Sequence, residues 1–251
     1  MIDVKKLIAV AALTVFYNSV CPDIYAEETI QPDNNTVIIN SFNAPDFVKL
    51  DNDLQNLIDD KYYGVTGLGV AVVKNGSLVY EKTLGSRYID NENRQNDLPM
   101  TRDTKLRIAS ISKTFVAVAV MQLTEQGKIN LDEDISKYLG FSLRNPNYPD
   151  IPITSRMLLS HTSSLRDGEV YAIPPQYSVK EFFEPGGRFY EGGAHFAPLG
   201  EAPGEFFHYT NLNYGLLGTI IENVTGTRFD KYMKEAVITP MGLDASFNVA
   251  D

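Results

Sequence analysis

The sequence predicts an α+β protein in which helices flank an antiparallel sheet and a second, mostly helical part follows. Three observations predict this class. Residues 68–83 have the pattern of two strands joined by Asn75-Gly76, a pair suited to a two-residue turn whose central residues both have positive φ. An amphipathic helical pattern precedes the hairpin, and further helical patterns follow residue 110. Because a lone hairpin is marginal in water, it should belong to a larger sheet.

The helices follow from apolar spacing. Phe47 to Tyr62 carries apolar residues at helical intervals and should cover one face of the sheet. Residues 110–126 form a second helix that ends at Gly127, and its lack of a polar face predicts burial all round. Other helices are expected at 132–139, 154–160, 178–184, 212–223 and 229–237, and short strands at 37–39 and 105–108.

One long stretch, residues 185–204, has six glycines, three prolines and no periodicity. Loops of this length in compact domains are usually functional or disordered. We expect it to line a substrate groove.

The first 26 residues have the pattern of a secretory signal peptide. Lys5 and Lys6 precede an apolar run at 7–17, and Ala26 offers a small residue for cleavage. The apolar run is shorter than the roughly 20 residues that span a bilayer. The pattern therefore predicts an exported protein, periplasmic or extracellular, that associates with a membrane only if the signal stays uncleaved.

Cys21 is the single cysteine of the chain and lies within this signal. A lipid-modified cysteine is the alternative, but residues 18–20 lack the small residue expected before it. Without Cys21 the exported protein has no disulfide and depends on burial for stability. Residues 27–44 should form a polar lead-in, and 45–251 the domain.

Charge and composition exclude several classes. The 251 residues include 22 Lys plus Arg and 32 Asp plus Glu, a net charge of −10, which argues against a nucleic-acid partner. A hydrophobic content of 43% is ordinary for a globular protein and excludes disordered and collagen-like chains. The acidic residues 132–134 indicate a solvated helix start, because no His or Cys ligands accompany them. No metal or other cofactor is expected.

Ser110-Ile111-Ser112-Lys113 opens the second predicted helix. At positions i and i+3, Ser110 and Lys113 share a face, and Ser110 lies at the positive end of the helix dipole, which favours a developing oxyanion. A lysine packed against apolar side chains loses hydration and can act as a base. Such a pair can activate serine without histidine. The pattern alone fits equally an N-capping serine beside a solvated lysine.

Tyr209 and Asn211 lie two residues apart just before a predicted helix. In an extended loop their side chains point the same way. A phenol there could shuttle a proton, and an amide could hold a substrate carbonyl or NH group. The alternative is a packed tyrosine and a helix-capping asparagine.

These features resemble a known family. Ser-x-x-Lys is a motif of β-lactamases and penicillin-binding proteins, and the sequence resembles the class C branch of that serine hydrolase superfamily over about residues 45–250. Four stretches carry the resemblance in the family's order: the nucleophile motif at 107–114, a His-Thr-Ser-Gly-Leu-like turn at 158–165, the Tyr-x-Asn motif at 203–218 and a Pro-Leu-Gly-Met-like segment at 240–243.

The resemblance implies a β-lactamase/transpeptidase-like fold and a serine hydrolase that forms an acyl-enzyme with β-lactams, D-Ala-D-Ala peptides or esters. By resemblance Ser110 is the nucleophile and Lys113 the base that activates it. Tyr209 passes the proton to the leaving group and later helps to activate water, and Asn211 contacts the substrate amide. His161 is expected to hold a turn. By the same resemblance, residues 45–110 and 211–251 lie on the sheet side and 111–210 form the largely helical part.

Two departures from the family stand out. Ser164 replaces the glycine of the His-Thr-Ser-Gly-Leu turn, and no Lys/His-Thr/Ser-Gly triplet occurs after Pro240. The strand that carries this triplet would supply a second oxyanion-hole NH, and losing one such donor costs about 10² to 10³ in rate. We therefore expect a piece of a longer reading frame that lacks the C-terminal strands. The alternative is a naturally short, inactive binding or regulatory scaffold.

Overall fold

The chain divides into two units, residues 1–109 and 110–251. The structure, a computed structural model, describes residues 47–170 and 172–248. The predicted signal peptide, the polar lead-in and the strand at 37–39 lie outside these residues. The predicted division into sheet-side and helical parts stays a prediction.

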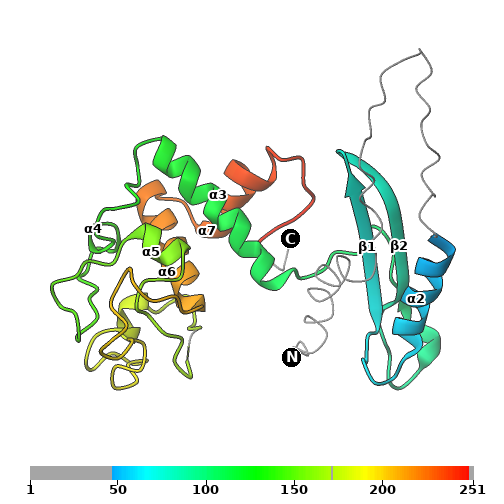
Figure 1. The fold of residues 1–251 in the computed structure, drawn as a ribbon, viewed down its shortest axis with the longest axis horizontal. Coiled ribbons are helices and arrows are strands. Elements are labelled where there is room, and N and C mark those ends of the chain that lie inside the picture. The colour runs from blue at the N-terminus through cyan, green and yellow to red at the C-terminus, as the bar shows by residue number, and fades with distance from the viewer. Residues whose placement is uncertain (1–46, 171, 249–251) are drawn as a thin grey trace, which may run out of the picture. The chain divides into compact units, whose positions relative to one another are not determined.

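The first unit is built on the predicted hairpin (Figure 1). Strand β1 (Gly67–Lys74) pairs antiparallel with β2 (Ser77–Tyr88). Asn75 and Gly76 have φ of +51° and +76°, as a two-residue type I′ turn requires. Both the hairpin and its turn are thus confirmed. A short strand, β3 (Leu98–Pro99), pairs with β2 and gives the sheet order β1-β2-β3.

The predicted strand at 105–108 does not form. A strand needs a neighbour to accept and donate its backbone hydrogen bonds, and nothing pairs with this segment among the described residues. β-Propensity alone was therefore misleading here, because the pairing partner decides the outcome.

Helix α2 (Phe47–Asp59) lies along one face of the hairpin, as predicted (Figure 1). The Asp51 carboxylate accepts a hydrogen bond of 2.6 Å from the Tyr80 hydroxyl of β2. This bond, with a smaller contribution from the neighbouring Lys82 ammonium, lowers the pKa of Asp51. The buried core between helix and sheet is small and consists of Leu54, Val65 and Leu68.

The second unit is mostly helical. Two predicted helices are irregular: residues Val179–Phe182 form only a 3-10 turn, η4, and Lys234–Ile238 form a π-turn, η5. Pro185 follows η4 closely and cannot continue a helix. The α-helices are α3 (Ser112–Glu125), α4 (Ser136–Leu139), α5 (Ser155–Leu159), α6 (Asn211–Thr225) and α7 (Phe229–Met233).

Helix α3 differs from its prediction in two respects. It begins at Ser112, after a 3-10 turn η3 over Ala109–Ile111. It is also not buried all round in the structure, since Val118 and Met121 are 38% and 44% exposed. The face that is buried carries Val116, Ala119, Val120 and Leu123. Within the described part of the second unit, α3 packs on α6, α7 and η5 through one side, so apolar content overestimated its burial there.

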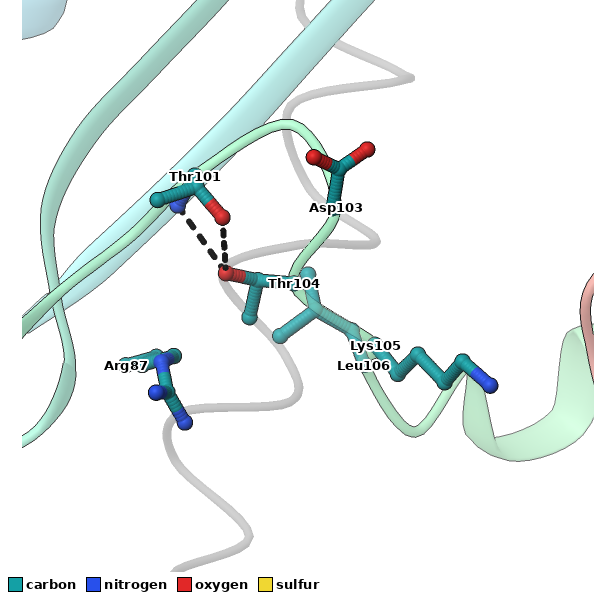
Figure 2. A pocket seen from close by; sticks show the side chains of 6 residues that line it. All are labelled: Arg87, Thr101, Asp103, Thr104, Lys105 and Leu106. Atoms are coloured by element: carbon teal, nitrogen blue, oxygen red, sulfur yellow. Dashed lines mark hydrogen bonds between the residues drawn. The ribbon is translucent and has the colours of Figure 1, made fainter. Parts of the chain in front are cut away.

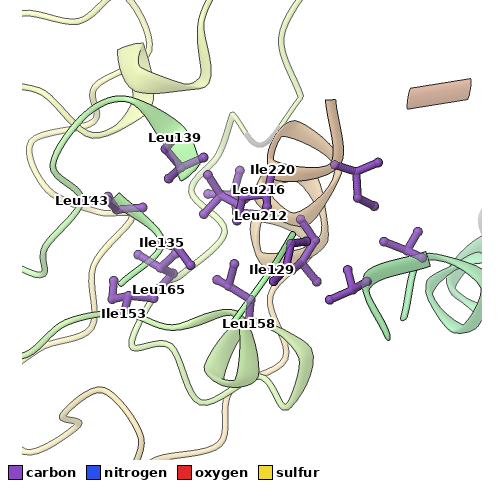
Figure 3. Close-up of a cluster of buried hydrophobic side chains, with 14 of the residues drawn as sticks. Ile129, Ile135, Leu139, Leu143, Ile153, Leu158, Leu165, Leu212, Leu216 and Ile220 are labelled. Carbon is purple, nitrogen blue, oxygen red and sulfur yellow. The ribbon is translucent and has the colours of Figure 1, made fainter. Parts of the chain in front are cut away.

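Helix α6 is the centre of the second unit's core (Figure 3). Its residues Leu216, Leu217, Ile220 and Ile221 are at most 1% exposed. Side chains of α4, α5 and the loops around them pack against it. Burial of apolar surface is the dominant favourable contribution to folding, and this cluster is the larger of the two apolar cores among the described residues. Helix α6 therefore gives the residues at its N-terminus a fixed position.

The stretch 185–204 has no helix or strand, as predicted, yet it is anchored to the core. Phe196 forms a β-bridge with Leu165, and the His195 carbonyl accepts a hydrogen bond from the Arg166 N–H at 2.9 Å. Among the described residues, no helix has the length and apolar content needed to cross a membrane.

Candidate active site

Ser110 lies in the tight turn that leads into α3. Ala109 before it has φ of +46°, a left-handed conformation that is costly for a residue with a Cβ. The Ser110 side chain is exposed. The N-cap position of α3 belongs to Ile111, and no side chain caps the helix there. The alternative interpretation of Ser110 as an N-capping serine is therefore wrong.

Two side chains converge on the Ser110 hydroxyl. The Lys113 ammonium lies 3.1 Å from Ser110 Oγ, and the Tyr209 hydroxyl donates to the same oxygen at 2.6 Å. Ser110 and Tyr209 are 99 residues apart in sequence. Their meeting cannot be explained by local chain geometry and depends on the packing of α3 against α6.

Asn211 completes the group. Its Oδ1 accepts a hydrogen bond of 2.9 Å from Lys113 Nζ. Lys113 is half-buried, and its Nζ lies 4.8 Å from the centre of the Tyr209 ring and 5.5 Å from that of Tyr214. Aromatic faces attract a cation at such distances. All four residues singled out from the sequence thus belong to one contact network, in which Lys113 touches the other three.

The second alternative from the sequence was a packed tyrosine and a capping asparagine. It is wrong for Asn211, whereas the Tyr209 ring does pack on His161 and still brings its hydroxyl to Ser110. Tyr209 is 44% exposed, and Asn211 is the first residue of α6 rather than its cap. Thr210 holds the N-cap position but makes no side-chain cap bond; its hydroxyl donates to the Leu165 carbonyl at 3.0 Å.

Residues 161–167, which we call the bracing turn, hold the Tyr209–Asn211 loop. His161 has φ of +58° and lies at its start. Its Nδ1 accepts the Thr210 N–H at 3.3 Å, and its ring lies 4.5 Å from that of Tyr209. Burial, helped by the Lys113 charge, lowers the pKa of His161. The geometry is that of a neutral ring holding a turn.

Ser164 explains how the bracing turn tolerates its missing glycine. It has φ of +58°, the left-handed conformation that glycine adopts without cost. Its side chain is buried, and its Oγ accepts a hydrogen bond from Asn145 Nδ2 at 3.1 Å. The left-handed backbone at Ser164 is therefore destabilising, and the hydrogen bond of its hydroxyl offsets part of that cost.

Sequence reasoning missed Asp167 at the end of the bracing turn. Its carboxylate accepts hydrogen bonds from the Asn211 backbone N–H at 2.9 Å, from Asn211 Nδ2 at 2.8 Å and from the Leu212 N–H at 2.9 Å. A single acidic residue in a loop gives no periodic signal. No other sign of this role was present in the sequence, because Thr210 at the N-cap position of α6 is itself a residue type that commonly caps helices.

Two other groups of residues include none of the four site residues. The acidic cluster 132–134 is used in ion pairs, Asp132 with Arg156 and Asp134 with Arg144. In the first unit, a hollow of about 470 Å³ holds none of the four site residues (Figure 2). It is lined by Arg87, Thr101, Asp103, Thr104, Lys105 and Leu106.

The geometry agrees with comparisons to known proteins. The β-lactamase family model matches residues 50–251. The chain belongs to the β-lactamase family. This membership confirms the resemblance and the fold class inferred from the sequence.

Relatives of this β-lactamase-family chain have diverse names. "Protein flp" of Staphylococcus aureus strain N315 is 31% identical over 199 residues, which cover 77% of this chain and 38% of that protein. ML-236A carboxylate methylbutanoyltransferase mlcH of Penicillium citrinum is 26% identical, over 70% of this chain and 45% of that protein. The chain thus spans less than half the length of these curated relatives.

Solved structures of the family show the same architecture. The octameric penicillin-binding protein homologue from Pyrococcus abyssi has a TM-score of 0.66 and 28% identity, over 79% of this chain and 44% of that one. EstCE1, a hydrolase with promiscuous acyltransferase activity, has a TM-score of 0.60 and 26% identity, over 78% of this chain and 51% of that one. The D-amino acid amidase of Ochrobactrum anthropi SV3, complexed with L-phenylalanine, has a TM-score of 0.57 and 27% identity, over 77% of this chain and 50% of that one.

Proposed function

We propose that this chain provides the nucleophile and proton-transfer groups of a serine hydrolase that acts through an acyl-enzyme. The observation that carries the proposal is the double contact at Ser110 Oγ, from Lys113 Nζ at 3.1 Å and from the Tyr209 hydroxyl at 2.6 Å. Nucleophilic serines depend on an adjacent base within hydrogen-bond reach. Both distances are within that reach.

In the proposed reaction, Ser110 Oγ attacks the carbonyl carbon of an amide or ester. Lys113, as the neutral amine, takes the Ser110 proton as the new C–O bond forms. Tyr209 hands a proton to the leaving nitrogen or oxygen when the tetrahedral intermediate collapses, and is reprotonated from Lys113. In deacylation Tyr209 relays a proton from the attacking water to Lys113, which is again a neutral amine, and this proton returns to Ser110 Oγ when the acyl bond breaks. Asn211 holds Lys113 and meets the substrate amide.

The substrate class is an acyl compound: a β-lactam, a D-Ala-D-Ala peptide or an ester. Its support is the range of chemistry in the names of structural relatives, which include an amidase, a hydrolase with acyltransferase activity and a penicillin-binding protein homologue. All of these names are compatible with acyl transfer to and from a serine. The signal-like sequence at 1–26 supports export, to a periplasm or to the outside of the cell.

The direct test is covalent labelling. Incubation with a fluorophosphonate or a β-lactam should add one adduct, which peptide mass spectrometry should locate at Ser110. Ser110→Ala should abolish it, whereas Ser112→Ala, two residues along the same segment, should not. Absence of an adduct on folded protein would contradict the proposal. Turnover of nitrocefin against a p-nitrophenyl ester then separates β-lactamase from esterase activity, and an adduct without turnover favours a binding or regulatory scaffold.

A further inference from the structure

Asp167 joins the bracing turn to the start of α6. Its half-buried carboxylate accepts three hydrogen bonds from the first two residues of that helix, two from the Asn211 and Leu212 backbones and one from the Asn211 side chain. Thr210 offers no side-chain cap. Asp167, 44 residues before Asn211, therefore supplies the acceptors that the free N–H groups of a helix start require.

A cap alone does not explain the third bond. The two backbone bonds suffice to satisfy the helix start, yet Asp167 Oδ2 also accepts from Asn211 Nδ2 at 2.8 Å. A carboxylate only accepts and a lysine ammonium only donates. In the neutral amine the lone pair must face the Ser110 hydroxyl, so toward Asn211 Lys113 donates in both of its forms. Asn211 lies between Asp167 and Lys113, so its amide has one favourable orientation, with Nδ2 toward Asp167 and Oδ1 toward Lys113.

The reversed amide would be unfavourable at both ends. It would place Oδ1 against the Asp167 carboxylate and Nδ2 against the Lys113 N–H groups. Lys113 would then lose the acceptor that holds it 2.9 Å from Asn211 and within 3.1 Å of Ser110 Oγ. The orientation of one amide thus determines whether Lys113 is held beside the serine.

We propose that Asp167 is a positioning residue that locks the Asn211 amide and thereby holds Lys113 against Ser110. The inference rests on the proposed function for its kinetic consequence but not for its structural one. Asp167 does not contact Ser110 or Lys113; it acts through Asn211.

A double-mutant cycle tests this. The second-order rate constant for fluorophosphonate labelling of Ser110 is measured for the unaltered chain, for Asp167→Ala, for Asn211→Ala and for the double variant. Misplacement of a reacting group by about 1 Å can cost 10²-fold, so we expect Asp167→Ala to slow labelling about 10- to 10²-fold. In the Asn211→Ala background the same change should have almost no further effect, because contacting residues couple.

A purely structural Asp167 would behave differently. The two backbone bonds persist in Asn211→Ala, so the loss of the cap lowers the melting temperature in both backgrounds. If Asp167→Ala slows labelling by the same factor in both backgrounds, the positioning role is overturned. Should Asp167→Ala fail to fold, Asp167→Asn takes its place in the cycle, since a neutral amide keeps the shape but loses one acceptor. An unchanged labelling rate and unchanged Asn211 exchange in Asp167→Asn would also overturn it.

A second measurement separates this inference from the proposed function. Hydrogen exchange of the Asn211 side-chain amide, followed by NMR, should accelerate in Asp167→Ala. Glu222→Ala is the matched control, because Glu222 lies at the other end of α6 and its carboxylate accepts the Phe229 N–H at the start of α7 at 2.7 Å. That variant should leave the exchange unchanged. If Ser110 of the unaltered chain is not labelled, the proposed function fails, and this exchange decides on Asp167 alone.

Discussion

Ser110 and Lys113 lie three residues apart at the start of one helix, whereas Tyr209 and Asn211 are held by side chains from the bracing turn more than 40 residues upstream. The first pair depends on helical spacing and on a strained Ala109. The second pair depends on a network centred on His161 and Asp167. The difference shows that one pair is encoded by local spacing and the other by tertiary contacts, and that the hydrogen bond from Lys113 to Asn211 couples them.

The largest effect on the rate of Ser110 labelling is expected at Tyr209, whose hydroxyl contacts Ser110. Tyr209→Phe removes the hydroxyl that donates to Ser110 Oγ and keeps the ring that packs 4.5 Å from His161. Loss of a proton-transfer group typically costs about 10² to 10⁴ in rate, and we expect a loss in this range in Ser110 labelling. The fold should be unchanged by circular dichroism.

Tyr214→Phe provides the matched control for this change. The Tyr214 ring also lies near Lys113, but its hydroxyl donates to the Leu159 carbonyl at 3.3 Å instead of to Ser110. Its labelling rate should stay within about twofold of the unaltered chain, since only one weak hydrogen bond is lost. Equal losses in the two variants would refute a distinct role for Tyr209.

A smaller effect is expected on the stability of the fold at acidic pH, through His161 of the bracing turn. Burial and Lys113 lower the pKa of His161, opposed by the Asp167 charge. Below the unfolded value of about 6.5 the unfolded chain then binds more protons than the folded one, so stability falls as pH falls. His208, whose pKa burial also lowers, adds to the same trend.

His161→Asn should therefore reduce the dependence of stability on pH. Asparagine tolerates the positive φ of this position but does not titrate. The measurement is urea unfolding at pH 7 and at pH 5. Between these pH values the unaltered chain should lose more of its free energy of unfolding than His161→Asn does. His208→Gln should reduce this loss by less than His161→Asn does. An identical pH dependence in both proteins would exclude His161 as a contributor.

The smallest effect is expected at Ser164. Ser164→Gly relieves the left-handed strain, worth about 1–2 kcal/mol, but loses the hydrogen bond to Asn145, worth about 1 kcal/mol. Glycine also raises the conformational entropy of the unfolded chain, which lowers the free energy of unfolding by about 0.4–1 kcal/mol. The net change should lie within about 1 kcal/mol. Ser164→Ala keeps the strain and loses the bond, so it should be the less stable variant in thermal unfolding.

The same contrast explains what the sequence revealed. The hairpin was predictable because Asn75-Gly76 imposes its turn, and Ser110 and Lys113 because they are three residues apart. Tyr209 and Asn211 were singled out by their two-residue spacing before a predicted helix, and their roles were taken from the family resemblance. Asp167 was not found, since a cap supplied from a distant loop has no spacing rule. The exposure of Val118 and Met121 was missed because hydropathy does not tell which faces of a helix find a partner.

The contact between Tyr209 and Ser110 closes a loop of 99 residues. Closing a loop of that length costs about 4 kcal/mol of chain entropy, several times the net value of one hydrogen bond. The apolar cluster around α6 must therefore offset the cost before the hydroxyl groups can meet. During refolding, reactivity at Ser110 should appear only after α6 is packed. The time at which Ser110 becomes reactive toward an active-site label would then report when the last step in the folding of the second unit is complete.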